Sequence, residues 1–173
     1  QNFFAVLSVI LFLCASPAMA DRLDEGITAR ESGDYRKAIR ILKPLATKGN
    51  SVAQYHFGEM LRKGQGIPQN YKYALSYYRK AAKQNYADAE YKIGLIYREG
   101  LGVPVNEARA FYWWKKAASH GNVDAQMNLG FIYFKGKGVK QSFVMAYAWS
   151  AVAASQKYMA AKSNQNIVAG LMT

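Results

Sequence analysis

The sequence predicts an all-α fold, a solenoid of about four helix-turn-helix repeats followed by a C-terminal half-repeat. Three observations predict it. Small and aromatic residues recur every 36 positions, the apolar residues of each unit keep helical spacing, and a Gly-x-Gly turn divides each full unit. Because no segment carries the signature of a β-strand, no sheet is expected.

The first expected element is an export signal at residues 1–20. Residues 3–15 carry no charge and are too few to span a bilayer comfortably as a helix. Ala18-Met19-Ala20 then forms the small-x-small pattern that a signal peptidase recognises. We therefore expect cleavage after Ala20, a periplasmic or secreted protein, and no transmembrane segment after cleavage. An N-terminal membrane anchor is the alternative.

The remaining chain, residues 21–173, is expected to form one helical-repeat domain. Its units cover about residues 21–50, 51–86, 87–122 and 123–158, and a terminal helix covers 159–173. The 36-residue register is carried by residues that recur in threes: Ala53, Ala89 and Ala125; Gly58, Gly94 and Gly130; Gly64, Gly100 and Gly136; Ala74, Ala110 and Ala146; and Tyr77, Trp113 and Trp149.

The first unit is shorter than the others. In its first half the offset to the next unit falls from 36 to 32 residues, so that Gly26 matches Gly58. The missing residues are those of the Gly-x-Gly loop, which Ser32-Gly33-Asp34 replaces. We still expect two helices here, joined by a tighter turn.

Each full unit is expected to begin with a helix, such as residues 51–63, where Ala53, Phe57 and Leu61 lie on one face. The Gly-x-Gly turn then ends this helix, because glycine adopts the left-handed backbone at little cost. A second helix follows at about residues 71–84. The residues suited to cap the second helices are Asn70, Asn106 and Ser142.

The glycine inside each first helix needs a physical reason, because glycine there costs about 1 kcal/mol relative to alanine. These residues are Gly58, Gly94 and Gly130. We expect close helix approach, with each glycine facing alanine on the second helix of its unit and neighbouring units stacked on both.

This order of small and aromatic residues resembles the SEL-one-like repeat family, relatives of the tetratricopeptide repeats. The resemblance covers residues 51–158 strongly and 21–50 more loosely. It implies a right-handed α/α superhelix in an exported bacterial protein, and a non-catalytic scaffold that holds partner proteins. One secreted branch of the family carries a cysteine pair in each repeat and is described as β-lactamase-like. The present sequence departs from that branch, since its only cysteine is Cys14.

The resemblance also implies where a partner binds, because the first helix of each tetratricopeptide-like unit lines the concave face. Counted from the helix glycine, the expected groove residues are Tyr55, Glu59, Arg62, Tyr91, Leu95, Arg98, Met127, Phe131 and Phe134. These positions vary between units while the small and aromatic framework does not. Tyrosine and arginine are common interface anchors.

We expect this groove to hold an extended or helical segment of another protein, with acidic groups near Arg62 and Arg98. For Met127, Phe131 and Phe134 the alternative is packing beneath the terminal helix.

Charge gives a second candidate function. The chain has 23 Lys and Arg against 11 Asp and Glu, a net charge of +12, and all of it follows residue 20. Several cations fall on the expected second helices, among them Arg79, Lys80, Lys83, Lys115 and Lys116. They form either a solvated surface or a site for anionic envelope polymer, as in a basic carbohydrate- or wall-binding accessory protein. Nucleic acid is not an expected partner, because no nucleic-acid motif is present.

Catalysis is the third and least supported class. Nucleophile motifs such as Gly-x-Ser-x-Gly and Ser-x-x-Lys do not occur, nor does His-Glu-x-x-His. His56 and His120 are the only histidines, so no metal-ligand cluster is expected. Glu59 lies one helical turn from His56 without a nucleophile beside it. We therefore expect no catalytic residue, no metal and no cofactor.

Overall fold

The computed structural model describes residues 17–156, which contain eight α-helices and no strand. The helices are α1 (Pro17–Glu31), α2 (Tyr35–Thr47), α3 (Ser51–Lys63), α4 (Tyr71–Ala82), α5 (Ala87–Glu99), α6 (Glu107–Ser119), α7 (Val123–Lys135) and α8 (Phe143–Ser155). The predicted all-α fold is confirmed. The expected terminal helix at 159–173 and the first sixteen residues of the expected export signal lie outside the described residues.

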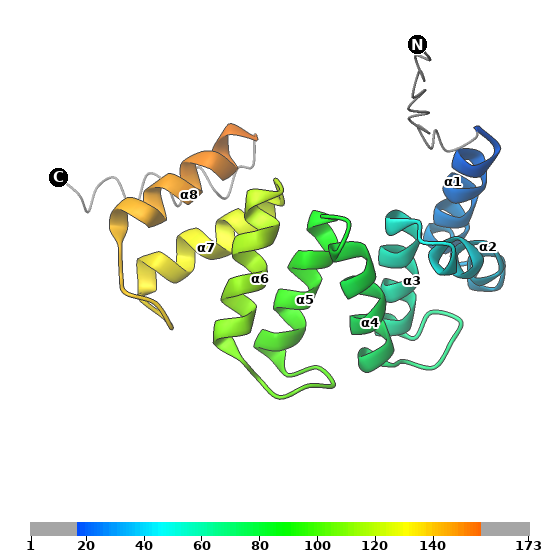
Figure 1. Cartoon of the computed structure of the whole chain (residues 1–173), viewed down its shortest axis with the longest axis horizontal. Helices are drawn as coiled ribbons and strands as arrows, with labels where there is room; N and C mark the ends of the chain where they lie inside the picture. Colours follow the sequence, from blue (N-terminus) through cyan, green and yellow to red (C-terminus); the bar gives the residue numbers. More distant parts are fainter. Residues whose placement is uncertain (1–16, 157–173) are drawn as a thin grey trace, which may run out of the picture.

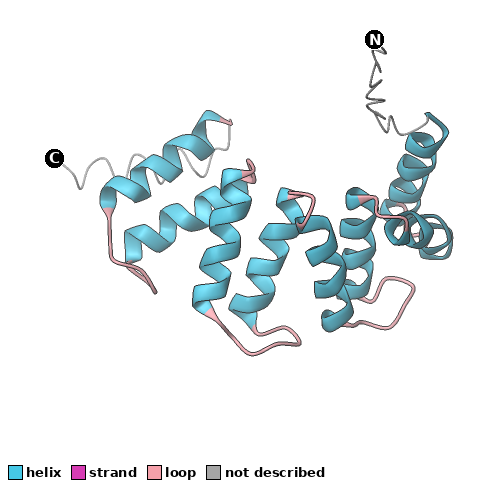
Figure 2. Ribbon diagram, in the orientation of Figure 1, coloured by secondary structure: helices cyan, strands magenta, loops and turns pink. Residues whose placement is uncertain are grey.

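The helices form four successive pairs. Each helix packs against the one before it and the one after it in the chain. Figure 1 shows the pairs following one another in a bowed row, with α1 and α8 at opposite ends. Figure 2 shows that only loops and turns connect them. Serial packing of this kind is the solenoid that the repeat predicted.

Local sequence explains where the first helices end. The helices α3, α5 and α7 each end at a glycine in the left-handed conformation, Gly64, Gly100 and Gly136, with φ of 69°, 69° and 66°. In α3 the observed bounds are the predicted ones.

The second helices begin at the predicted N-caps. Asn70 accepts a hydrogen bond from the backbone N–H of Tyr73, and Asn106 accepts one from that of Arg109. Ser142 caps α8 in the same way. The helix α4 ends at Ala82 rather than at the predicted residue 84. Before α2, Asp34 of the shortened turn is the N-cap, and its side chain accepts from the N–H of Lys37.

Close helix approach at the mid-helix glycines is confirmed, but the expected alanine partner is wrong at Gly58 and Gly94. A methyl group at Gly58 would lie 2.7 Å from Cε1 of Tyr78, and one at Gly94 would overlap the indole of Trp114. At Gly130 the nearest atom is the Oγ of Ser150, at 2.8 Å. Gly58 and Gly94 therefore make room for an aromatic side chain on the second helix, and not for alanine, whereas Gly130 faces Ser150 and, at 3.4 Å, the backbone oxygen of Ala146.

A pair of side-chain amides, one buried and one exposed, links the two helices in two of the full units. Gln54 on α3 accepts from Nε2 of Gln84, just after α4, at 3.0 Å, and its own Nε2 donates to the backbone oxygen of Ala46 at 3.1 Å. Two repeats further along the chain, Gln126 and Gln156 form the equivalent pair, with Nε2 of Gln156 donating to Gln126 at 3.1 Å. Each pair ties one unit together and also reaches back to α2 or α6 of the previous unit.

The middle unit replaces this amide pair with ionisable groups. Glu90 is fully buried, and its Oε2 lies 2.7 Å from Nδ1 of His120. A carboxylate cannot donate to Ala82, the carbonyl equivalent to Ala46. Instead Lys116 donates to that oxygen at 3.3 Å and also lies 2.9 Å from Oε1 of Glu90. His120 is thus the C-cap residue of α6 and a side-chain partner of a buried acid.

Candidate partner-binding face

The expected groove residues lie on three first helices. They are Tyr55, Glu59 and Arg62 on α3; Tyr91, Leu95 and Arg98 on α5; and Met127, Phe131 and Phe134 on α7. We call this set the first-helix strip. Its members have different surroundings, and these surroundings decide which of them can meet a partner directly.

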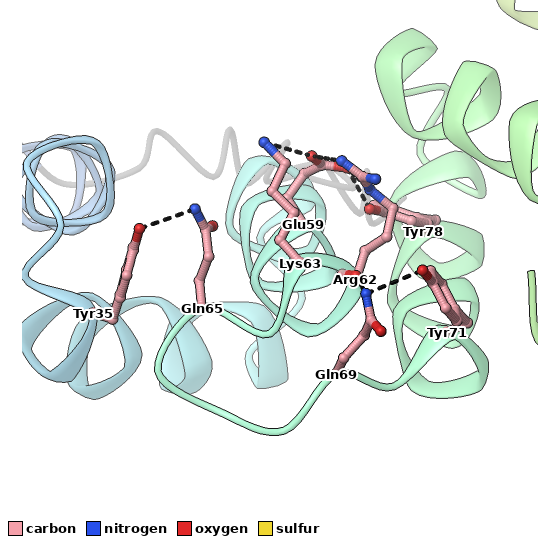
Figure 3. Close-up of polar contacts among 8 residues, drawn as sticks. All are labelled: Tyr35, Glu59, Arg62, Lys63, Gln65, Gln69, Tyr71 and Tyr78. Carbon is pink, nitrogen blue, oxygen red and sulfur yellow. Dashed lines mark hydrogen bonds and ion pairs between the residues drawn. The ribbon is translucent and has the colours of Figure 1, made fainter.

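At the α3 end of the strip, Glu59 is buried and held by its neighbours. Nε and Nη2 of Arg62 lie 2.9 Å from its two carboxylate oxygens, and the Tyr78 hydroxyl donates to it at 2.5 Å. Nζ of Lys63 is 3.7 Å away. Figure 3 shows these side chains converging on Glu59. An acidic partner segment would therefore compete with Glu59 for Arg62, since that charge is already paired.

These contacts explain the acidity of Glu59. Burial alone would raise the pKa of its carboxyl group, but hydrogen bonds from Arg62 and Tyr78, with the positive charge of Lys92 and Arg62, lower the pKa to about 2. The carboxylate is therefore ionised at neutral pH. It orients Arg62 and Tyr78 and does not act as a proton donor.

Tyr55 belongs to an aromatic cluster between the units. Its ring centroid lies 5.3 Å from that of Tyr86 and 6.1 Å from that of Tyr78. Burial, with the nearby charges of Glu59 and Asp88, raises the pKa of Tyr55. The ring is half-buried, so only part of it is open to solvent.

Farther along the strip, Tyr91 and Leu95 are also partly buried against the core.

A pocket opens at the α7 end of the strip. It is lined by Arg98 of α5, by Glu107 and Trp114 of α6, by Asn128, Phe131 and Ile132 of α7, and by Lys137. The guanidinium carbon of Arg98 lies 5.3 Å from the ring centroid of Trp114, within cation–π range. The Phe131 side chain beside it is 53 % exposed. The structure thus brings together two strip residues, a cation and an exposed ring, around one depression.

The last strip residues are less open. Phe134 is half-buried, and its ring centroid lies 5.9 Å from that of Phe143 on α8. Met127 is also half-buried. The alternative in which these residues pack under the terminal helix concerns residues outside the described part of the chain.

His56 and Glu59 do not form the acid–base pair considered from the sequence. Nδ1 of His56 is buried with no hydrogen-bond partner among the described residues. Burial and the charge of Arg30 lower the pKa of His56 to about 4, although the charge of Glu59 opposes this. The ring is therefore neutral at pH 7, and its ring contact is with Tyr55, at 5.2 Å between centroids.

Within residues 17–156, no group of three or more His, Cys, Asp or Glu side chains is placed to hold a metal ion. The same part of the chain has no helix of the length and apolar character needed to cross a membrane.

The sequence predicted Arg98 and Phe131 of this pocket but not its other five residues, Glu107, Trp114, Asn128, Ile132 and Lys137. Asn128 lies two residues before Gly130, a position that the groove pattern left out. His56 and Lys92 occupy the same position in the other full units. A polar residue at this position in all three units was the signal that the sequence offered. Trp114 was missed because the aromatic residue that recurs every 36 positions is its neighbour Trp113.

Some cations of the second helices bind other side chains, and others do not. Lys116 is bound to Glu90, and Arg79 donates to the Tyr97 hydroxyl at 2.6 Å. In contrast, Lys83 and Lys115 are exposed and form no ion pair within the described residues. The basic face is therefore partly structural and partly free.

Comparison with known proteins gives a family. The family model for the Sel1 repeat matches residues 18–50, 51–86, 87–122 and 123–158. Among solved structures, a Sel1 repeat protein from Oxalobacter formigenes is 31 % identical, with a TM-score of 0.73 over 78 % of this chain and 54 % of that one. A protective antigen from uropathogenic Escherichia coli, which displays an SLR fold, is 32 % identical, with a TM-score of 0.75 over 83 % and 32 %.

The chain thus spans about half of the first of these structures and a third of the second. The cysteine-rich protein B of Helicobacter pylori shares the fold at 20 % identity and a TM-score of 0.61, over 75 % of this chain and 93 % of that one. No curated protein sequence matches the chain.

Proposed function

Since the chain belongs to the Sel1 repeat family, whose fold typically mediates protein–protein interaction, we propose that it is a non-catalytic scaffold that binds a segment of a partner protein along the first-helix strip. The proposed location is the bacterial envelope, periplasmic or secreted.

One observation carries this proposal. Phe131 exposes 53 % of its surface beside a pocket that contains Arg98, Asn128 and the edge of Trp114. An exposed ring next to a guanidinium and an amide offers a partner both apolar area and directed hydrogen bonds, the combination found at interface hot spots.

The strip residues then have two kinds of role. Arg98 and Phe131 are exposed enough to meet the partner directly. Glu59 is a positioning residue, because it is buried and holds Arg62. Tyr55, Tyr91 and Leu95 supply a half-buried floor, and Met127 and Phe134 extend it along α7.

The test is capture of proteins from an envelope extract by immobilised wild-type protein and by Phe131→Ala and Arg98→Glu variants. We expect each variant to retain less than a fifth of the wild-type signal for the same partner, since an anchor residue contributes about 1–2 kcal/mol or more. Tyr112→Ala is the matched control, because Tyr112 is 61 % exposed but lies on α6 outside the strip. Circular dichroism must show unchanged helicity. Equal capture by wild type and both strip variants would refute the proposal.

A second candidate is binding of an anionic envelope polymer by the second helices of the units. The observation in its favour is the set of exposed cations that form no ion pair within the described residues, including Arg36, Arg40, Lys83 and Lys115. Binding of this kind depends strongly on salt. The test is retention on purified acidic polysaccharide. Loss of retention between roughly 50 and 300 mM salt, over which the screening length falls by about one to two halvings, would support this candidate. Retention unaffected by Lys83→Glu and Lys115→Glu would contradict it.

Export is proposed from the uncharged residues 3–15 and the small-x-small pattern that ends at Ala20. The helix α1 begins at Pro17, so cleavage after Ala20 would remove its first turn. Mass spectrometry of the protein from bacterial periplasm should find Asp21 as the first residue. A product that retains residues 1–20 in the membrane fraction would favour the anchor.

A further inference from the structure

The third unit of the solenoid fills a position between its helices with its own tyrosine. Tyr97 of α5 is only 4 % exposed, and its hydroxyl accepts from Nη2 of Arg79 at 2.6 Å and from Nη1 of Arg109 at 3.3 Å. The guanidinium of Arg109 also lies 5.3 Å from the ring centroid. A phenol ring thus lies among α4, α5 and α6, with its oxygen held by two cations.

The preceding unit has the same position without the ring. Thirty-six residues earlier, Leu61 replaces Tyr97, Lys43 replaces Arg79, and Tyr73 replaces Arg109. A pocket opens there among α2, α3, the α3–α4 loop and α4. It is lined by Lys43, Phe57, Leu61, Ile67, Pro68, Asn70, Tyr73 and Tyr77.

The loop wall of this pocket is anchored at both ends. Nε2 of Gln65 donates to the Tyr35 hydroxyl at 3.3 Å, and Nε2 of Gln69 donates to the backbone oxygen of Arg62 at 2.7 Å and to the Tyr71 hydroxyl at 3.0 Å (Figure 3). The N–H of Asn70 donates to the backbone oxygen of Leu61 at 2.8 Å. The pocket is therefore formed before any ligand arrives, which lowers the entropic cost of binding.

The chemistry of the lining suits an aromatic ring. Phe57 and Tyr77 meet edge to face, with centroids 5.0 Å apart, and form an aromatic wall. Tyr73 exposes 63 % of its surface at the rim. Lys43 is exposed and forms no ion pair within the described residues, so its ammonium group can donate to an incoming oxygen.

We propose that this pocket binds a tyrosine side chain presented by a segment of a partner protein. The incoming phenol occupies the place that Tyr97 fills in the next unit, and its hydroxyl accepts from Lys43. This site lies on α2, α3 and α4 and is separate from the first-helix strip, so it does not depend on the function proposed above.

The first experiment titrates the 173-residue chain with three blocked tripeptides, acetyl-Gly-Tyr-Gly-amide and its Phe and Ala counterparts, and follows amide resonances by NMR. A single buried ring supports an affinity of about millimolar. We expect saturable shifts at Leu61, Asn70 and Tyr77 with the Tyr peptide, about three-fold weaker binding of the Phe peptide, and no saturation with the Ala peptide. In a Lys43→Met variant, the Tyr and Phe peptides should bind equally.

Two reciprocal variants test the equivalence between the units. Leu61→Tyr fills the pocket with the chain's own ring, as Tyr97 does, and should weaken the Tyr peptide at least ten-fold without lowering the melting temperature. Tyr97→Leu should open a second pocket, which is seen as new saturable shifts at Val103 and Trp113. If either variant does not fold, Tyr73→Ala at the exposed rim should still weaken binding about five-fold. Tyr112→Ala on α6 is the control and should change nothing.

The proposal is overturned if the Tyr peptide binds Leu61→Tyr as well as wild type, or if its shifts map to the first-helix strip. It is also overturned if N-acetylglucosamine shifts the same resonances at lower concentration than the Tyr peptide, because the pocket would then be a sugar site. Loss of partner capture in Phe131→Ala with peptide binding intact would separate this site from the proposed scaffold function.

Discussion

At the scale of single residues, three positions control the packing and charge of the first helices. Gly94 lies under the indole of Trp114, His56 is buried without a partner for Nδ1 in the described part of the chain, and Glu59 holds Arg62 and Tyr78. Each position gives a measurable consequence.

Gly94→Ala should destabilise the protein although alanine is the better helix former. The added methyl group would overlap the Trp114 ring, which is 2 % exposed and cannot move outward. Overpacking costs about 1–3 kcal/mol, against about 1 kcal/mol gained from helix propensity. Gly130→Ala is the matched comparison, because the nearest atom there is the rotatable Ser150 hydroxyl. Urea unfolding should give a lower midpoint for Gly94→Ala than for Gly130→Ala, and the reverse order would contradict the packing account.

His56 should make stability fall as the pH falls from 7 to 4. Its pKa in the folded protein is about 4, below the ordinary 6.5, because burial and Arg30 disfavour the charged ring. Between these values the unfolded chain binds more protons, so that stability rises with pH across this window. Because the ring is half-buried, solvent screens part of the effect, and we expect about 1–2 kcal/mol.

The measurement compares urea unfolding of wild type and His56→Asn at pH 7 and pH 4. Asparagine occupies the equivalent position at Asn128 and does not titrate. The variant should lose less stability than wild type between the two pH values. An equal loss would show that His56 does not titrate as described.

Glu59→Gln should cost about 2–4 kcal/mol at pH 7, because it leaves the Arg62 guanidinium without its counter-charge in a half-buried site. The folded pKa of Glu59, about 2, lies below the ordinary 4.5, so its contribution is present above pH 4.5 and is lost as the pH falls towards 2. The difference between variant and wild type should therefore shrink across that window. A difference that does not depend on pH would instead indicate a packing effect.

At the scale of helices, local signals were sufficient for most of the fold. Helix starts and ends depend on residues close to them in the sequence, such as the N-cap Asn70 and the C-cap Gly64. The sequence therefore predicted the bounds of the helices well. The partners of Gly58 and Gly94 were mispredicted, because Tyr78 and Trp114 lie twenty positions away on the next helix and their ring orientation depends on packing. The exposure of each strip residue was unpredictable for the same reason: Glu59 is buried by Tyr78, which repeat spacing alone does not reveal.

The Glu90 site allows a test between helices. Glu90→Gln alone should cost about 1–3 kcal/mol, because Lys116 loses its buried counter-charge. The double change Glu90→Gln with His120→Gln recreates the amide pair of Gln54 and Gln84. We expect it to recover part of the loss, with a coupling energy of about 1 kcal/mol in a double-mutant cycle. Additive costs would show that His120 and Glu90 do not interact.

At the scale of the whole molecule, the stacked pairs place the first-helix strip along three consecutive units, with its most exposed ring, Phe131, in the last of them. The pocket at Lys43 and Tyr73 lies at the other end, over α2, α3 and α4. A solenoid with two separate surfaces can hold a partner at more than one point, which raises the effective affinity without stronger individual contacts.

The most direct test of the central claim is site-specific photocrosslinking. A benzophenone side chain is placed at Phe131 or Leu95 on the strip, and at the exposed residues Tyr112 and Val144 on second helices as controls. The protein is then illuminated in an envelope extract, and crosslinked partners are identified by mass spectrometry. We expect one shared partner protein to be captured from both strip positions and from neither control. Capture of that protein equally from the control positions, or no capture from the strip, would contradict it.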